Sequence, residues 1–414
     1  MFRRLLPAAL LTSAALCVVV AVAGPLAPPA GPPAPTHKTL ADVEPRTPIA
    51  SLPLTISQPG SYYLTRDLSV AAGNAILVTA PDVTIDLNGF TIRNTGLADR
   101  GVFANADALR LRVRNGSIRD FRFQGILAQA RSASIDRVRV TVVDVNGGGI
   151  ELRGDHGVIL ACTATGSAPT PLGVGLEARG EASSIRSSSA VGFSINVTGG
   201  KGSLIARCRT SGGVTGILAS TGSRIVDSAS FRNAGSGFSI GPSGAVDGCI
   251  ARQNTTGFSA LNTSSTFDNC TARGNTANGF YISAAGVSAC VSYDNADNGL
   301  ESFSGSTISR CVVSANGSYG IRLAGFSTAT FNLCDGNVGD GIALLGAGNR
   351  VHDNTLTDNR YGLDASASNN LFSRNVASGN TTGQFFVGQP QTNGPVVTAA
   401  GSITTPSPFA NFQY

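Results

Sequence analysis

Residues 279–321 read GFYISAAGVSACVSYDNADNGLESFSGSTISRCVVSANGSYGI and repeat one pattern about every 21 residues. Each repeat begins with a glycine that is followed by a large apolar residue. The pairs are Gly237-Phe238, Gly257-Phe258, Gly279-Phe280, Gly299-Leu300, Gly320-Ile321, Gly341-Ile342 and Gly362-Leu363. Their successive intervals are 20, 22, 20, 21, 21 and 21 residues. A fixed period of this length predicts an architecture in which one short structural unit is stacked many times.

An asparagine stands three or four residues before each of these glycines and before Gly383. The series comprises Asn233, Asn254, Asn275, Asn295, Asn316, Asn337, Asn359 and Asn380. Asparagine and glycine are the residues that most readily adopt a left-handed backbone. We therefore expect these asparagines to form a corner at the same place in every repeat.

A further column lies between the glycines, with an apolar residue at position i and a small polar or thiol residue at i+3. Phe267 and Cys270 are an example. Followed along the chain, the i+3 column contains Asn88, Gly116, Val138, Cys162, Ser188, Cys208, Ser228, Cys249, Cys270, Cys290, Cys311, Cys334, Asn354 and Asn375. The column predicts about fourteen turns.

The apolar stretches are too short to form hairpins with a core of their own, and no sustained helical spacing of apolar residues is present. Stacking equivalent stretches in parallel lets backbone groups pair with the next turn and inward side chains form continuous columns. We therefore predict an all-β, single-stranded parallel β-helix over residues 76–390. Segments 44–75 and 391–414 are expected to cap its ends, because a bare end would expose unpaired strand edges.

The corner asparagines, the glycine-apolar starts and the segment VTIDLNGFTI (83–92) resemble the right-handed parallel β-helix repeat proteins of the pectin-lyase-like fold. The resemblance covers about residues 76–390 and implies a right-handed coil. Proteins of this family include polysaccharide lyases, hydrolases, epimerases, adhesins and many exported bacterial members without assigned chemistry. The resemblance therefore implies a fold rather than one activity.

The amino-terminal segment has the features of a secretion signal. Arg3 and Arg4 precede the apolar stretch 5–22, and Ala21-Val22-Ala23 offers a small-x-small cleavage site. Residues 1–23 are therefore predicted to be a signal peptide, with a retained membrane anchor as the alternative, and residues 24–43 a proline-rich linker. The mature protein is expected to be periplasmic, cell-surface or extracellular, without a membrane segment, and monomeric.

The formal net charge is +5, but the basic residues are scattered and do not alternate with aromatic residues. Nucleic-acid binding is therefore not expected. Five arginines gather near the longest repeats, at Arg110, Arg112, Arg114, Arg119 and Arg122. Loops on a rigid scaffold often carry binding sites, so these arginines are candidates for binding an acidic glycan.

Eight cysteines would suggest disulfides in an exported protein, but Cys17 lies in the signal and seven is an odd number. In one column, the Cβ atoms of neighbouring cysteines should point in parallel rather than toward each other. We therefore expect a ladder of free thiols, continued by Asn354 and Asn375 with amides bonded along the stack. A soft-metal thiolate site is the alternative, since the resemblance includes a branch that handles copper in the periplasm, but no histidine lies in the column and no metal site is assigned.

Catalytic motifs of the resembling hydrolases are largely missing. Gly154-Asp155-His156-Gly157 replaces their Gly-His-Gly, and no aspartate pair is found. His156 is a catalytic candidate whose alternative is a surface loop residue. Lyases of this fold hold Ca²⁺ with clustered acids, so Ca²⁺ is the expected cofactor only if the protein is a lyase.

Acidic residues recur two positions after the repeat glycine, in a column expected to point outward. Glu151 and Glu177 are expected on neighbouring turns, where they could share a cation or act as a carboxylate pair, and Glu301 with Arg322 should form a surface ion pair. The sequence leaves two functions open. One is a structural, adhesive or glycan-binding protein, and the other is a polysaccharide lyase or related enzyme acting on an acidic glycan.

Overall fold

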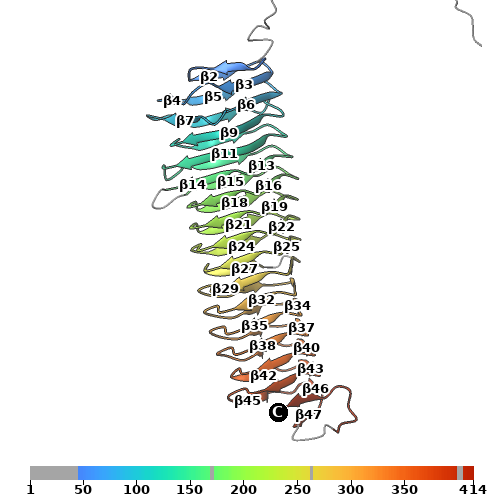
Figure 1. Ribbon diagram of the computed structural model, residues 1–414. Helices are drawn as coiled ribbons and strands as arrows, with labels where there is room; N and C mark the ends of the chain where they lie inside the picture. Colours follow the sequence, from blue (N-terminus) through green and yellow to red (C-terminus); the bar gives the residue numbers. More distant parts are fainter. Residues whose placement is uncertain (1–44, 168–171, 262–263, 399–403) are drawn as a thin grey trace, which may run out of the picture. The chain divides into compact units, whose positions relative to one another are not determined.

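The computed structural model describes residues 45–167, 172–261, 264–398 and 404–414. Within these ranges the chain forms 48 β-strands and no helix. Strands pair in parallel with the equivalent strands of the coils before and after them, and the coils of residues 46–414 stack along one axis (Figure 1). The predicted all-β, right-handed parallel β-helix is confirmed. The predicted signal peptide and linker lie outside the described residues.

Each coil contributes one strand to each of three faces. Face 1 is a separate sheet of sixteen strands, so the prediction of about fourteen turns is close. Its strands are β2 (Leu54–Ile56), β5 (Asn74–Val78), β8 (Arg100–Ala104), β10 (Gln124–Ala128), β12 (Gly148–Leu152), β15 (Val174–Ala178), β18 (Ile195–Gly199), β21 (Thr215–Ala219), β24 (Ser236–Ile240), β27 (Thr256–Ala260), β30 (Phe280–Ile282), β33 (Leu300–Ser302), β36 (Ile321–Leu323), β39 (Ile342–Leu344), β42 (Tyr361–Ala365) and β45 (Gly383–Val387).

Faces 2 and 3 follow face 1 in each coil. They form one sheet because β9 (Arg112–Arg119) and β11 (Ser134–Val142) run through the corner between them. Face 2 also contains β1 (Thr47–Ile49), β3 (Gly60–Leu64), β6 (Val83–Asp86), β13 (Val158–Leu160), β16 (Ser184–Arg186), β19 (Leu204–Ala206), β22 (Arg224–Val226), β25 (Ala245–Asp247), β28 (Thr266–Asp268), β31 (Gly286–Ser288), β34 (Thr307–Ser309), β37 (Thr328–Thr330), β40 (Arg350–His352), β43 (Leu371–Ser373) and β46 (Thr392–Asn393). Face 3 also contains β4 (Leu68–Val70), β7 (Thr91–Asn94), β14 (Thr163–Gly166), β17 (Ser189–Val191), β20 (Arg209–Ser211), β23 (Ala229–Phe231), β26 (Ile250–Arg252), β29 (Thr271–Arg273), β32 (Val291–Tyr293), β35 (Val312–Ser314), β38 (Leu333–Asp335), β41 (Thr355–Thr357), β44 (Val376–Ser378), β47 (Val396–Thr398) and β48 (Asn411–Gln413).

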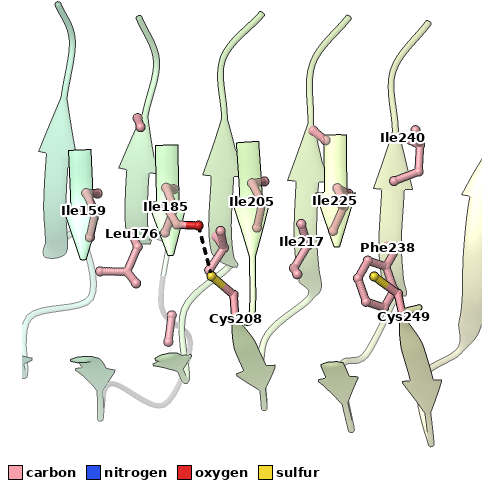
Figure 2. Packing of buried hydrophobic residues seen from close by; sticks show 14 of the residues in the cluster. Ile159, Leu176, Ile185, Ile205, Cys208, Ile217, Ile225, Phe238, Ile240 and Cys249 are labelled. Atoms are coloured by element: carbon pink, nitrogen blue, oxygen red, sulfur yellow. Dashed lines mark hydrogen bonds between the residues drawn. The ribbon is translucent and has the colours of Figure 1, made fainter. Parts of the chain in front are cut away.

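Inward side chains form vertical files that hold the coils together. Figure 2 shows Ile185, Ile205 and Ile225 of face 2 side by side in one row on successive coils, with Ile217 and Phe238 of face 1 also turned into the core. All five are fully buried. Each such side chain contributes on the order of 1.5–3 kcal/mol by leaving water, so a short strand becomes stable only when it is stacked. This is why a 21-residue repeat forms coils.

The two segments expected to cap the ends contain strands that continue the stack. In segment 44–75, β1 pairs with β3 and β2 pairs with β5 in parallel, so these residues form the first coils. In segment 391–414, β46 pairs with β43 and β48 pairs with β44. The last complete coil is therefore covered by the carboxyl-terminal strands.

The expectation that the repeated asparagines adopt the left-handed backbone is wrong. The left-handed residue stands one position earlier, as at Arg232 (φ 50°) and Asp294 (φ 60°). The asparagines themselves are buried and bonded from coil to coil. Asn316, for example, donates its backbone N–H (3.1 Å) and its Nδ2 (2.9 Å) to Oδ1 of Asn337. The corner thus needs a side chain that accepts a buried backbone N–H.

Cys334 does not lie in the cysteine column, contrary to the prediction. It pairs in register with Leu356, and the column position in its coil is Asn332, which donates its backbone N–H to Oδ1 of Asn354 over 2.9 Å. With Cys334 at position i+3, the pattern requires Phe331 as the inward apolar residue of this repeat. Phe331 is 61% exposed at a left-handed corner (φ 58°), and Ala329 points inward instead.

Asn88 is also outside the buried column. It is an exposed left-handed residue (φ 52°), and its backbone N–H is bonded to Oδ1 of Asp86 over 2.9 Å. The buried position is taken by Leu87, against whose Cβ a side chain at Gly116 would clash. The early corner contains extra residues, which shifted the assumed register.

The other column cysteines, Cys162, Cys208, Cys249, Cys270, Cys290 and Cys311, lie at the corner between faces 2 and 3, and all are buried. All seven described cysteines are free thiols. Neighbours in the column contact through backbone, as where Cys270 donates its N–H to Sγ of Cys290 over 3.3 Å. Above them Asn354 donates Nδ2 to Oδ1 of Asn375 over 2.9 Å, as the sequence suggested.

Candidate functional site

The outward surface of face 1 contains the two candidate glutamates. Glu151 of β12 and Glu177 of β15 are directly in register on adjacent coils. Their neighbours Ile150 and Leu176 point into the core, which turns both carboxylates outward. Although they are on the outer surface, the two residues are only 4% and 6% exposed. Because water has little access to them, the two carboxylates must obtain hydrogen bonds and ion pairs from the surrounding side chains.

Arginines satisfy this carboxylate pair. Arg153 Nε lies 2.6 Å from Glu151 Oε1, and Arg179 Nε lies 2.6 Å from Glu177 Oε1 and 3.5 Å from Glu151 Oε1. Gln124 donates Nε2 to Glu151 Oε2 over 2.9 Å. Burial raises the pKa of the Glu177 carboxyl, although the hydrogen bond from Arg179 acts in the opposite direction. The pair is thus an arginine-fixed cluster, and a cation such as Ca²⁺ would have to displace guanidinium groups to obtain its six to eight oxygens.

The cluster continues toward the amino terminus through Arg100. Arg100 Nε donates to Gln124 Oε1 over 3.0 Å, and its guanidinium lies 5.3 Å from the ring centre of Phe103 and 5.2 Å from that of Phe123. A cation held between two rings keeps one orientation. Arg100, Gln124, the glutamates and their arginines therefore form one polar and aromatic surface over four coils, which we call the amino-terminal cluster.

A second group on face 1, the carboxyl-terminal cluster, was not predicted as a site. Glu301 is bonded by Arg322, and its Oε2 accepts Asn278 Nδ2 over 2.9 Å and Asn298 Nδ2 over 3.4 Å. The sequence did anticipate the pairing of Glu301 with Arg322, and these residues lie in register on adjacent coils. The ring of Tyr281, which is in register with Glu301, packs edge-on against Phe303 with 4.8 Å between centres.

The same cluster contains a pair of aspartates. Asp340 is fully buried and forms two bonds of 2.8 Å with Arg360, which also lies 3.8 Å from Asp364. Burial raises the pKa of the Asp364 carboxyl, and although a bond from Ser366 opposes this, the nearby Asp340 raises it further. The bond to Asp340 in turn raises the pKa of Arg360. Asp364 is therefore a carboxyl that holds a proton more readily than an exposed aspartate does.

The two clusters are separated by coils that carry no charged residue at the face 1 position in register with Glu177. This position is occupied in turn by Thr198, Leu218, Ser239 and Ser259. A signal for the second cluster was present in the sequence. Asn278, Asn298 and Asp340 each stand directly before a repeat glycine, a column that the sequence reading did not follow.

His156 is not part of either cluster. It is the exposed left-handed residue (φ 58°) of the corner between β12 and β13, and its backbone N–H is bonded to Glu181 O over 2.9 Å. None of the described hydrogen bonds or ion pairs joins its side chain to Glu151 or Glu177. The structure thus gives His156 the position of a surface loop residue.

The five candidate arginines are spread over different parts of the coil. Arg112 and Arg114 are outward residues of face 2, and Arg119 is an outward residue of face 3. Arg110 is a left-handed corner residue bonded to Asp82 over 2.6 Å, and Arg122 stacks on Phe123 beside face 1. The structure does not bring them together, so they do not form one binding site.

A family model for a right-handed beta helix region matches residues 100–276, 194–335 and 256–402, which together span more than half of the chain. The chain belongs to this right-handed β-helix family. No curated protein matches it.

Several solved structures are similar to this β-helix. The A-module of the mannuronan C-5 epimerase AlgE4 of Azotobacter vinelandii is 14% identical, with 85% of this chain and 90% of that chain covered and a TM-score of 0.35. A mutant tailspike protein of E. coli bacteriophage HK620, in complex with a pentasaccharide, is 10% identical, with 86% and 72% covered and a TM-score of 0.40. The periplasmic alginate epimerase AlgG is 12% identical, with 81% and 83% covered and a TM-score of 0.28.

Two kinds of feature are absent from the described ranges. No group of three or more histidine, cysteine or acidic side chains there is arranged to hold a metal ion. No helix in these ranges is long and apolar enough to span a membrane.

Proposed function

We propose that the β-helix is an exported glycan-binding protein that holds an extended sugar chain along face 1. The observation that carries this proposal is the pair of clusters on one outward surface, each built from arginine-fixed carboxylates, amides and aromatic rings. Planar carboxylate, amide and guanidinium groups can form paired hydrogen bonds with sugar hydroxyls, and rings such as Phe303 can pack against the apolar side of a sugar.

The rigidity of these groups supports binding. The side chains of Glu151, Glu177, Glu301 and Arg322 project from strands of a continuous sheet and are already held by neighbours, as Glu151 is by Arg153 at 2.6 Å. A preorganised site loses little conformational entropy when a ligand binds. The coils between the clusters are uncharged at these positions of face 1 and would let one long chain contact both clusters, so affinity should rise with the length of the oligosaccharide.

A panel of neutral and acidic polysaccharides tests the proposal. The protein should retard at least one polymer in affinity electrophoresis, and the variants R100Q and F303S, one in each cluster, should weaken that retardation. The variant R350Q is the matched control, because Arg350 is an exposed residue of face 2. Retardation of no polymer, or an equal loss with R350Q, would overturn the proposal.

A second candidate function is cleavage or another acid–base reaction of an acidic glycan. It is favoured by the aspartate pair, in which burial makes the Asp364 carboxyl retain a proton more readily while Asp340 is paired with Arg360. A carboxyl with a raised pKa is suited to act as a general acid. Mass spectrometry of the same polymers after incubation should then detect products that are lost in D364N. Binding without products would leave the first function and exclude this one for the polymers tested.

A further inference from the structure

Face 3 carries a file of arginines held by aromatic rings, on a different face of the coils from the charged clusters of face 1. Phe231 lies between Arg209 of the preceding coil and Arg252 of the following coil, whose guanidiniums are 5.2 and 5.3 Å from the ring centre. One coil further on, Arg273 lies 5.1 Å from the ring centre of Tyr293. The three arginines are exposed, and the rings are half-buried.

These arginines differ from those of face 1 because they have no acidic partner. Arg153, Arg179, Arg322 and Arg360 each form an ion pair, whereas Arg209, Arg252 and Arg273 form none with any described residue. Their guanidinium N–H groups also donate no hydrogen bond within the described chain. Each guanidinium therefore keeps its donors available while a ring restricts its movement.

The register adds an unfavourable feature that a ligand would remove. Arg252 and Arg273 are directly opposite each other on neighbouring parallel strands, which lie about 4.8 Å apart. Like charges in this relation destabilise a sheet. An anion placed between the two guanidiniums would replace their repulsion with charge-assisted hydrogen bonds.

A depression of about 400 Å³ lies at the corner that follows this file. It is lined by Arg232 and Gln253, the residues directly after Phe231 and Arg252, and by Gly212 and Thr276. Arg232 donates Nε to Gln253 Oε1 over 3.1 Å, which fixes a fourth guanidinium at its rim. The file and the depression thus form one basic, hollowed surface over several coils.

We propose that this surface is a second binding site, for a polyanionic glycan that carries carboxylate or sulfate groups. The glycan lies along the axis of the coils, Arg252 and Arg273 bind one anionic group, and Arg209 and Arg232 bind its neighbours. Phe231 and Tyr293 act as positioning residues that hold the guanidiniums. This site is separate from face 1 and does not depend on the function proposed there.

A single-stranded nucleic acid is also a linear polyanion, but its proteins stack bases on open aromatic rings. Here the ring centre of Phe231 lies 5.2 and 5.3 Å from two guanidiniums and that of Tyr293 lies 5.1 Å from one, so each ring already contacts a guanidinium. These half-buried rings offer less surface for base stacking than open rings do. The surface therefore suits an acidic glycan better than a nucleic acid.

The test compares two variants with the same loss of charge. R252Q/R273Q removes the opposed pair, and R224Q/R350Q removes two exposed, unpaired arginines of face 2 that contact no ring. Binding of the full chain to heparin and to polygalacturonate is measured by calorimetry at several salt concentrations. R252Q/R273Q should bind at least one polymer about tenfold more weakly, as expected for the loss of roughly two charge-assisted contacts, and R224Q/R350Q should bind within about twofold of the wild type.

A third variant, F231A, keeps every charge and removes only the ring. It should weaken binding several-fold, which a purely electrostatic surface would not show. Equal losses in the two double variants, no binding of either polymer, or full competition by oligo(dT) would overturn the proposal. Because R252Q/R273Q and F231A lie on face 3, the behaviour of R100Q and F303S reports on face 1 independently.

Discussion

The corner between faces 2 and 3 contains two regions that differ only in the chemistry of one column. From Cys249 to Cys311 the buried position is a thiol on four consecutive coils, and from Asn332 to Asn375 it is an amide on the next three. The residue before the column position is left-handed in both regions, as at Arg310 (φ 55°) and Asp353 (φ 60°). The backbone is therefore the same, and the side chains can be compared directly.

In both regions the backbone N–H of the column residue donates a hydrogen bond to the next coil, but the strength of this bond differs. Cys270 donates its N–H to a sulfur atom at 3.3 Å, whereas Asn332 donates its N–H to an amide oxygen at 2.9 Å. The amide also donates, and Asn354 Nδ2 is bonded both to Asn375 Oδ1 (2.9 Å) and to Ala329 O (3.0 Å). Sulfur is a weak acceptor and a weak donor. The comparison shows that the corner requires an acceptor, and that the amide adds a second, cross-coil bond.

Breaking the amide region should have the largest effect. In N354A, the backbone N–H and Nδ2 of Asn332 lose their shared acceptor at 2.9 and 3.0 Å, and Asn375 loses a donor. Buried groups left without partners cost about 1–3 kcal/mol each, so the free energy of unfolding should fall by about 3–5 kcal/mol. Denaturant titration measures this change. The control N146A alters an exposed asparagine, and a similar loss there would contradict the ladder as the cause.

Alkaline pH should next distinguish the thiol positions of the column from its amide positions, because only thiols titrate. Cys162 and Cys208 are thiols of the same column on earlier coils. Burial raises the pKa of Cys162 and Cys208 from 9.0 to about 11. The raised pKa of an acid stabilises the fold below pH 9.0, and this stability is lost as the pH rises from 9.0 toward about 11. We expect a loss on the order of 2–3 kcal/mol for each thiol. Unfolding free energies of the wild type and C162S/C208S, measured across this range, should diverge, and identical pH slopes would rule out the thiols as the source.

Much of the fold could be predicted because the repeat fixes which residues stack. The predicted register was wrong where the larger apolar residue of a repeat is exposed and a smaller one is buried. In the coil of Asn332, the large Phe331 is exposed and the small Ala329 is buried, so the larger apolar residue was the wrong guide. The asparagine corner failed for a related reason. Asparagine tolerates a left-handed backbone, but here its capacity to accept and donate hydrogen bonds in the core decides its place.

The candidate site was predicted less completely. The sequence placed Glu151 and Glu177 on neighbouring coils because both follow a repeat glycine by two residues, and the structure has them in register. It could not reveal that Arg153 and Arg179 fold back onto them, since a side chain's conformation does not follow from the period. The basic file on face 3 was missed because the sequence analysis did not follow the column that contains Arg252 and Arg273, although their separation of 21 residues equals the repeat period.

Within the thiol region, the acceptor can be removed or exchanged. C290A leaves the N–H of Cys270 without its acceptor at 3.3 Å and opens a small cavity, so we expect a loss of about 1–2 kcal/mol. C290S should lose less than about 1 kcal/mol, since Ser188 and Ser228 already accept the N–H groups of Cys162 and Cys208 at 3.0 and 3.1 Å. Denaturant titration of both variants distinguishes acceptor loss from sulfur loss. If C290S were less stable than C290A, the packing of the sulfur atom would be the dominant contribution to stability.

Replacing the last thiol before the amide region by an asparagine should change the free energy of unfolding least. It also compares the two side chains in the same coil. In C311N, the new amide would lie one coil before Asn332, whose Oδ1 already accepts the N–H of residue 311 at 3.0 Å. The Nδ2 of the new asparagine could donate to that same oxygen, as Asn332 Nδ2 donates to Asn354 Oδ1. One added bond should raise the unfolding free energy by up to about 1 kcal/mol. The matched control is C334N, because Cys334 faces the apolar core in register with Leu356 and an amide there would be buried without partners, costing about 1–3 kcal/mol. A loss in C311N as large as in C334N would mean that the thiol coils are too narrow for an amide, and that size rather than hydrogen bonding separates the two regions.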